Sequence, residues 1–167
     1  EATLTHQPIE VTTRGDLANR SGHAGTAVVL FVDPCDVPFL EDWLDASQDG
    51  RWGRFDAIVM ADTCLPRAYW KRALRPRWWA PLDKATQQQL QTGPTLEAAH
   101  QVVALFPTLS TFERVVFACT YGKSRSQLTA QAYRQWAGLT GSGDAALIQR
   151  NPWWHHLLEH ALSTARS

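Results

Sequence analysis

Residues 114–137 read RVVFACTYGKSRSQLTAQAYRQWA, and this stretch decides the fold. Positions 114–118 form a short apolar run rich in β-branched residues, which predicts a buried strand. Positions 126–137 carry apolar residues at helical spacing, and Gly138 is a suitable helix stop. The tight segment from Cys119 to Arg125 joins the two elements. We therefore expect a strand, a loop and a helix in immediate succession.

Two further segments carry strand signals. Residues 27–32 and 55–61 are continuous apolar runs, so each predicts a strand that is buried on both faces. Residues 1–25 show no sustained period, and we expect a loop-rich approach with one edge strand there.

Helix signals separate these strands. Apolar residues recur at helical spacing over residues 39–46, 66–75 and 95–106, and a final helix opens at Asn151-Pro152. Strands that alternate with helices predict an α/β fold with a mostly parallel central sheet flanked by helices. At 167 residues the whole chain, residues 1–167, is expected to form a single domain.

The composition limits the classes of partner. Hydrophobic residues make up 44% of the chain and charged residues 19%, which is typical of soluble globular proteins. Sixteen basic and sixteen acidic side chains cancel, so no global field would attract nucleic acid or an anionic membrane. Recognition of an anion must therefore be local. The densest set of cations is either a solvated helix face or a ligand-docking surface, and comprises Arg67, Lys71, Arg72, Arg75 and Arg77.

The cysteines and histidines show no metal-binding pattern. Cys35, Cys64 and Cys119 stand far apart, which predicts neither a disulfide framework nor a metal site and favours a reducing, cytoplasmic compartment. We expect Cys35 and Cys64 to be buried among apolar side chains. The alternative is a protective disulfide with Cys119 under oxidation. His156 and His160 lie one helical turn apart but lack a third ligand, so we expect no metal and no cofactor.

The segment from Cys119 to Ser126 carries the chemistry. Backbone N–H groups at a loop and at a helix start form a concavity that suits an anion, and the helix dipole adds partial positive charge. Gly122 allows a sharp turn, and the guanidinium of Arg125 can pair two phosphoryl oxygens. The same dipoles and charge favour a nucleophilic thiolate at Cys119. Ser126 is placed to hydrogen-bond the sulfur.

The remaining loop positions complete a predicted phosphate loop. Its members are Thr120, Tyr121, Gly122, Lys123, Ser124 and Arg125. We expect Tyr121 and Lys123 to project toward substrate or solvent. A nucleotide-binding P-loop is excluded, because the glycine that its pattern requires is here Phe117. The competing interpretation is a buried structural cysteine at an ordinary turn between strand and helix.

With these residues the chain resembles the cysteine-dependent phosphatase superfamily, in particular the dual-specificity-like branch and its small bacterial members. Their signature is His-Cys-x-x-Gly-x-x-Arg-Ser/Thr between a strand and a helix. The resemblance extends over residues 79–162, with one departure, because Ala118 replaces the histidine. It implies a cysteine phosphatase-like fold and hydrolysis of a phosphate monoester through a Cys119 phosphoenzyme. The implied substrate is a phosphorylated protein or a small phosphomonoester.

The resemblance also implies a general-acid aspartate on a separate loop before the nucleophile. The segment Trp79-Ala80-Pro81-Leu82-Asp83 is similar to the Trp-Pro-Asp loop of the family, which makes Asp83 the first candidate. Such an acid would protonate the leaving group and later activate water. The competing role for Asp83 is a helix N-cap before residues 84–90. Asp62 is the reserve candidate, whereas Asp56 lies inside a strand run and is expected to be structural.

Two other functions remain open from the sequence. The loop would bind phosphorylated ligands without turnover if the chain is a pseudophosphatase, and Ala118 favours this possibility. A rhodanese-like sulfurtransferase also places a cysteine loop after a strand. Gly122 and the Arg125-Ser126 pair fit the phosphatase loop better.

Overall fold

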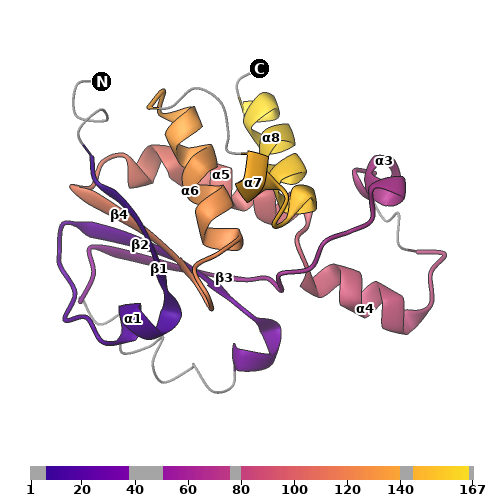
Figure 1. The fold of residues 1–167 in the computed structure, drawn as a ribbon, viewed down its shortest axis with the longest axis horizontal. Coiled ribbons are helices and arrows are strands. Elements are labelled where there is room, and N and C mark those ends of the chain that lie inside the picture. The colour runs from indigo at the N-terminus through magenta and orange to yellow at the C-terminus, as the bar shows by residue number, and fades with distance from the viewer. Residues whose placement is uncertain (1–6, 38–50, 76–79, 140–144, 166–167) are drawn as a thin grey trace.

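The chain forms a parallel four-stranded sheet with helices on both faces (Figure 1). The computed structural model describes residues 7–37, 51–75, 80–139 and 145–165, so the helix expected over residues 39–46 lies outside it. The strands lie in the order β1-β4-β2-β3, and every pairing is parallel. They are β1 (Ile9–Thr13), β2 (Thr26–Val32), β3 (Arg54–Val59) and β4 (Arg114–Cys119). The predicted α/β class with a parallel sheet is confirmed.

Helices occupy the connections between the strands, and α6, α7 and α8 follow the last strand, β4. The long ones are α4 (Lys84–Thr92), α5 (Leu96–Leu109), α6 (Arg125–Trp136) and α8 (Pro152–Ala165). The short ones are α1 (Arg14–Ala18), η2 (Pro34–Asp36), η3 (Arg67–Tyr69), α3 (Trp70–Ala73) and α7 (Ala145–Ile148). Figure 1 shows α5, α6 and α8 over one face of the sheet and α1 against the other. No helix in the described ranges is long and apolar enough to cross a membrane.

The central strand β2 explains why the sheet is covered on both sides. Every residue of β2 is buried, and its side chains alternate between two apolar clusters. Val29 and Phe31 pack with α5, α6 and α8, whereas Val28 and Leu30 pack with Leu17 of α1. Burial of each such side chain contributes about 1.5–3 kcal/mol. The continuous apolar run of β2 therefore requires a layer on each face, as the sequence predicts.

The expectation for β3 is wrong in one respect. Its apolar run predicts a strand buried on both faces, but β3 lies at an edge of the sheet and most of its residues are half-buried. Val59, its last residue, is 55% exposed. A continuous apolar run does not distinguish a central strand from an edge strand that is partly covered by loops.

The N-terminal and middle segments also differ in detail from the expectations. Residues 1–25 contain the expected edge strand, β1, but also a short helix whose first turn is capped by Thr13 Oγ1. The helix expected over residues 66–75 is present over residues 67–73, as the 3₁₀ turn η3 followed by the single α-helical turn of α3. Pro66 immediately precedes η3, and another proline follows at position 76, so the two limit the length of helix available.

The topology brings three chain segments to one edge of the sheet. Because β2, β3 and β4 are parallel, their carboxyl ends lie at the same edge. The residues that follow them are Asp33 after β2, Met60 and Asp62 after β3, and Thr120 after β4. The loop after β4 leads directly into α6.

Candidate functional site

Cys119 is the last residue of β4 and lies at the base of the loop. It is only 2% exposed, and its sulfur is 3.0 Å from Ser126 Oγ in the first turn of α6. The predicted contact between Ser126 and the sulfur is therefore present. Either atom of this pair can be the donor, because a thiol and a hydroxyl both carry a hydrogen.

Gly122 allows the loop to turn back toward β1. Its φ is +66°, in the left-handed region that favours glycine. A Cβ atom at this position would lie 3.0 Å from the carbonyl oxygen of Thr12. The side chain of Gln127 donates to the Gly122 carbonyl oxygen at 2.9 Å and fixes the turn from the α6 side. Both the dihedral angle and the close approach of Thr12 require glycine.

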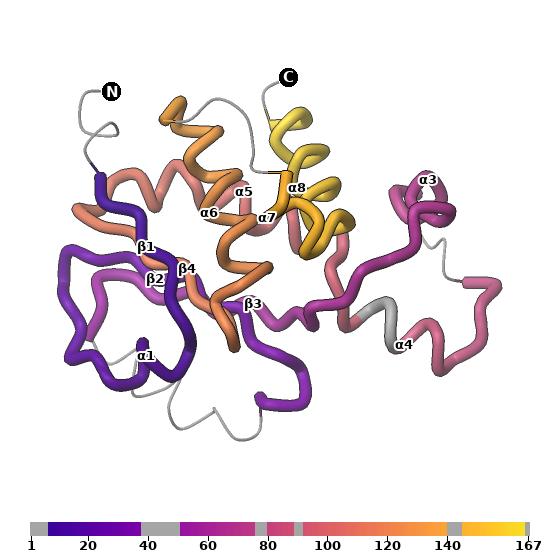
Figure 2. The backbone as a smooth tube through the Cα atoms, in the orientation of Figure 1, coloured from indigo at the N-terminus to yellow at the C-terminus, as the bar shows by residue number. Residues whose placement is uncertain are grey.

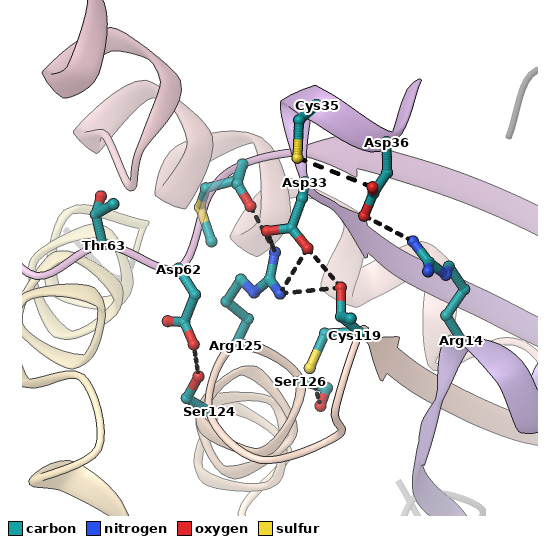
Figure 3. A network of polar contacts seen from close by, with 12 residues as sticks. Arg14, Asp33, Cys35, Asp36, Asp62, Thr63, Cys119, Ser124, Arg125 and Ser126 are labelled. Atoms are coloured by element: carbon teal, nitrogen blue, oxygen red, sulfur yellow. Dashed lines mark hydrogen bonds and ion pairs between the residues drawn. The ribbon is translucent and has the colours of Figure 1, made fainter. Parts of the chain in front are cut away.

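The guanidinium of Arg125 is buried beneath the loop, with the residue only 2% exposed. Its Nη1 donates to Asp33 Oδ1 at 3.0 Å and to the Met60 carbonyl oxygen at 2.7 Å. Its Nη2 lies 3.4 Å from both Asp33 Oδ2 and Thr120 Oγ1. Thr120 Oγ1 in turn donates to Asp33 Oδ2 at 2.5 Å. Figure 3 shows Asp33 and Arg125 pointing toward one another next to Cys119.

One N–H donor of the Arg125 guanidinium lacks an acceptor in the described part of the chain. The Nε of Arg125 is buried and has no hydrogen-bond partner among the described residues. An unsatisfied buried donor costs about 1–3 kcal/mol, and more when the group is charged. Arg125 is therefore oriented by Asp33 and Met60 but retains an N–H that an anionic ligand could satisfy.

Asp62 is held against the loop by two donors, of which Figure 3 shows Ser124. Ser124 Oγ donates to its Oδ2, and Asn151 Nδ2 donates to its Oδ1 at 2.8 Å. Asn151 is buried, donates as well to the Thr63 carbonyl oxygen at 3.0 Å, and caps α8 by accepting from Trp154 N. The Asp62 residue itself remains exposed, so its carboxylate lies at the rim of the loop with access to solvent.

Asp83 lies elsewhere and has another role. Its carboxylate accepts from Thr86 N at 2.8 Å and from Thr86 Oγ1 at 2.9 Å, which makes Asp83 the N-cap of α4. These hydrogen bonds from Thr86 lower the pKa of the exposed Asp83 carboxyl. In Figure 1, α4 stands apart from the β4–α6 loop. The helix-cap interpretation of Asp83 is confirmed, and it is Asp62 that the fold brings to the loop.

Two loop side chains project outward as predicted. Tyr121 is 74% exposed, and Lys123 is exposed as well. Arg150, which precedes α8, donates to the Lys123 carbonyl oxygen at 2.7 Å and so ties the loop to the C-terminal helix. One aromatic and one cationic side chain of the loop therefore face solvent.

The other two cysteines contradict their prediction. Cys35 and Cys64 are exposed rather than buried among apolar side chains. Each follows a sheet strand by a few residues and lies in a connection rather than in a core-facing position, which the general preference of cysteine for burial does not reveal.

The histidine pair does not form part of a metal cluster in the described ranges. His156 stacks on Trp70 with ring centroids 4.6 Å apart and on Trp153 at 6.0 Å. Within the described ranges, no group of three or more His, Cys, Asp or Glu residues could hold a metal ion. His156 is thus part of an aromatic contact between α3 and α8.

Asp33 and Asn151 are the site residues that the sequence analysis missed. The sequence pattern assigns Asp33 no role in the site and indicates Asn151 only as the start of a helix. A usable signal for Asp33 was its position, because polar residues just after buried parallel strands meet at the carboxyl edge of the sheet. For Asn151 no local signal beyond the N-cap preference pointed to the loop.

Comparisons with known proteins add no family assignment. No protein-family model, no curated protein and no solved structure matches the chain.

Proposed function

We propose that this chain hydrolyses phosphate monoesters, as a phosphatase of the protein tyrosine or dual-specificity type, through a phosphoenzyme on Cys119. One observation carries the proposal: a buried thiol lies at one strand–loop–helix junction with a buried guanidinium, one N–H of which has no acceptor among the described residues. Phosphate is a suitable ligand for such a junction, because it accepts hydrogen bonds from loop amides and from an arginine fork at the same time.

In the first step the Cys119 thiolate attacks phosphorus and forms an S–P bond. The P–O bond to the leaving group breaks, and its electron pair goes to the leaving oxygen, which takes a proton from an acid. In the second step water attacks phosphorus, gives up a proton, and displaces the sulfur as a thiolate. The hydrogen bond between Ser126 Oγ and Cys119 Sγ, 3.0 Å long, favours that departure.

Asp62 is the better candidate for the acid, because it is held at the loop while Asp83 caps α4. The contacts also identify the oxygen that would carry the proton. Asn151 Nδ2 can only donate, so Oδ1 of Asp62 must remain an acceptor. The Ser124 hydroxyl can both donate and accept, so it tolerates a proton on Oδ2. We therefore assign proton transfer to Oδ2 of Asp62.

Binding of phosphorylated ligands without turnover is the second candidate. It is favoured by Asp33, whose carboxylate lies within 3.0 to 3.4 Å of both terminal nitrogens of Arg125. An incoming dianion would have to share the guanidinium with this carboxylate. Ala118, which replaces the family histidine, favours the same candidate.

Turnover of p-nitrophenyl phosphate by the parent protein and by single variants tests the proposal. We expect Cys119→Ser to abolish turnover, and Asp62→Asn to lower kcat by a factor of about 10²–10⁴, the typical contribution of a general acid. Asp83→Ala is the matched control, which loses a helix cap but no group at the loop. Binding of vanadate without turnover would instead support the second candidate, binding of phosphorylated ligands without hydrolysis. Sulfur transfer from thiosulfate to cyanide would instead indicate a sulfurtransferase.

The three cysteines are unpaired, and two of them are exposed. Free exposed thiols persist in a reducing compartment. We therefore propose the cytoplasm as the compartment in which the protein works.

A further inference from the structure

A strongly basic segment follows the candidate acid. Residues 63–82 contain no aspartate or glutamate and five cations, namely Arg67, Lys71, Arg72, Arg75 and Arg77, although the net charge of the chain is zero. We call residues 63–75 of this segment, all of which the structure describes, the basic arm. All four of its cations are exposed, and no ion pair joins any of them to a carboxylate in the described ranges. The arm is thus a local positive surface without internal compensation.

The start and the middle of the arm are held in place, by contacts of Asp62 and of Trp70. At its start, Asp62 is held by Ser124 and Asn151. Further along, the Trp70 ring contacts the Trp153 ring of α8 with centroids 5.6 Å apart, and Trp70 Nε1 donates to the Leu65 carbonyl oxygen at 2.7 Å. The chain can be followed from β3 into α3 in Figure 2. The cations therefore have a defined position relative to the loop of Cys119.

Two of the cations are oriented by aromatic rings. The guanidinium carbon of Arg67 lies 5.0 Å from the centroid of the Trp70 ring, and that of Arg72 lies 5.0 Å from the Tyr69 ring. A stacked guanidinium loses rotamer freedom but keeps its N–H groups, which lie in its own plane, available for carboxylates. The same stacking covers one face of each ring, which makes the rings poor platforms for nucleic-acid bases. An acidic peptide therefore fits the arm better than a nucleic acid does.

We infer that the basic arm binds acidic residues that flank the phosphorylated residue of a protein substrate whose phosphate enters the loop of Cys119. This inference rests on the proposed function and adds a substrate class to it. Arg67 is five residues from Asp62, and five extended residues span at most about 18 Å. The acidic residues should therefore lie within about five positions of the phosphorylated residue.

The test compares phosphotyrosyl peptides in pairs. The two peptides of a pair differ only in three flanking residues, which are glutamate in one and glutamine in the other. In one pair these residues precede the phosphotyrosine, and in a second pair they follow it. We expect kcat/KM to favour the glutamate peptide about threefold to tenfold at low salt, the range expected for a few exposed charge pairs, and the preference to shrink at high salt. The Arg67→Glu/Arg72→Glu double variant should lose or reverse the preference.

A second variant and a control protect the test against misfolding. Lys71→Glu/Arg75→Glu reverses two cations for which no ring contact is recorded in the described ranges, and it should weaken the preference in the same direction. Arg114→Glu is the matched control, because Arg114 is exposed but begins β4, at the opposite end of the strand from Cys119. It should leave the preference unchanged.

The outcomes separate this inference from the proposed function. If the protein turns over p-nitrophenyl phosphate but shows equal kcat/KM for the glutamate and glutamine peptides, the role of the basic arm is overturned and the proposed phosphatase activity stands. If the parent protein shows no turnover, fluorescence anisotropy of the labelled peptides with the Cys119→Ser protein decides. The inference is supported if the glutamate peptide binds more tightly than the glutamine peptide and the Arg67→Glu/Arg72→Glu variant loses this difference. Equal binding of the two peptides overturns it. Tighter binding of a single-stranded RNA oligonucleotide than of either peptide overturns the assignment to acidic proteins.

Discussion

The carboxylate of Asp33 pairs with the guanidinium of Arg125, with Oδ1 3.0 Å from Nη1, although 92 residues separate the two in sequence. The pair forms because β2 and β4 are parallel neighbours, with Leu30 opposite Ala118, so that the residues after both strands meet. Asp33 neutralises a buried charge and also sets the direction of the remaining N–H groups of Arg125. The two side chains therefore hold one another in place at the site.

Removal of the Asp33 carboxylate should lower stability and strengthen anion binding. Arg125 is almost completely buried, and removal of one partner from such a pair typically costs about 3–5 kcal/mol. Because Asp33 is partly exposed, we expect the lower part of this range for Asp33→Ala in urea unfolding at pH 7. Phosphate should stabilise the variant more than the parent, since the ligand replaces the missing carboxylate. An equal effect of phosphate on both proteins would show that the ligand does not reach Arg125.

The Asn151 side chain should matter for activity as well as for stability. Asn151→Ala removes the N-cap of α8 and the donor to Asp62, so we expect a loss of about 1–3 kcal/mol and a fall in kcat with p-nitrophenyl phosphate. Thr95→Ala is the matched control, because Thr95 caps α5 through Ala98 N and makes no side-chain hydrogen bond to the loop in the described ranges. The control should lose stability and keep its kcat. A similar loss of kcat in both variants would assign the effect to stability alone.

The local part of the site could be predicted from the sequence, and the tertiary part could not. The β4–loop–α6 unit is encoded by consecutive residues, and its helix begins within one residue of the expected position. Asp33 and Asn151 reach the loop through strand order and through the docking of α8, which no local pattern specifies. The pattern ending at Asp83 has a second physical explanation, the N-cap of α4, and the structure adopts it.

The two left-handed glycines near α6 provide a paired test of the loop. Gly122 and Gly138 both have positive φ, so Ala at either position costs about 1–2 kcal/mol of backbone strain. At Gly138 the added methyl group meets open space, but at Gly122 it would lie 3.0 Å from the Thr12 carbonyl oxygen. We expect both variants to lose stability, Gly122→Ala more than Gly138→Ala because of the close backbone contact, and only Gly122→Ala to bind vanadate or phosphate at least tenfold more weakly. Isothermal titration calorimetry measures the binding. Unchanged binding in Gly122→Ala would show that the loop is not the anion site.

The aromatic contact between α3 and α8 should make stability sensitive to acid. Burial between Trp70 and Trp153 is the main cause that lowers the pKa of His156, and burial also lowers that of His155. The ordinary pKa of histidine is about 6.5, so below this pH the unfolded chain binds protons that the folded chain does not. The free energy of unfolding should therefore fall as the pH decreases from about 7 toward 5.

Substitution of His156 identifies its share of this effect. His156→Phe keeps an aromatic ring against Trp70 and removes the titrating group, so urea unfolding at a series of pH values should give a flatter profile than the parent. His155→Gln should remove a further part of the slope, since its ring is also partly buried. The direction of the slope is the decisive result. Stability that rises as the pH falls from 7 to 5 in the parent, and no longer does so in His156→Phe, would mean that the stack prefers the protonated ring.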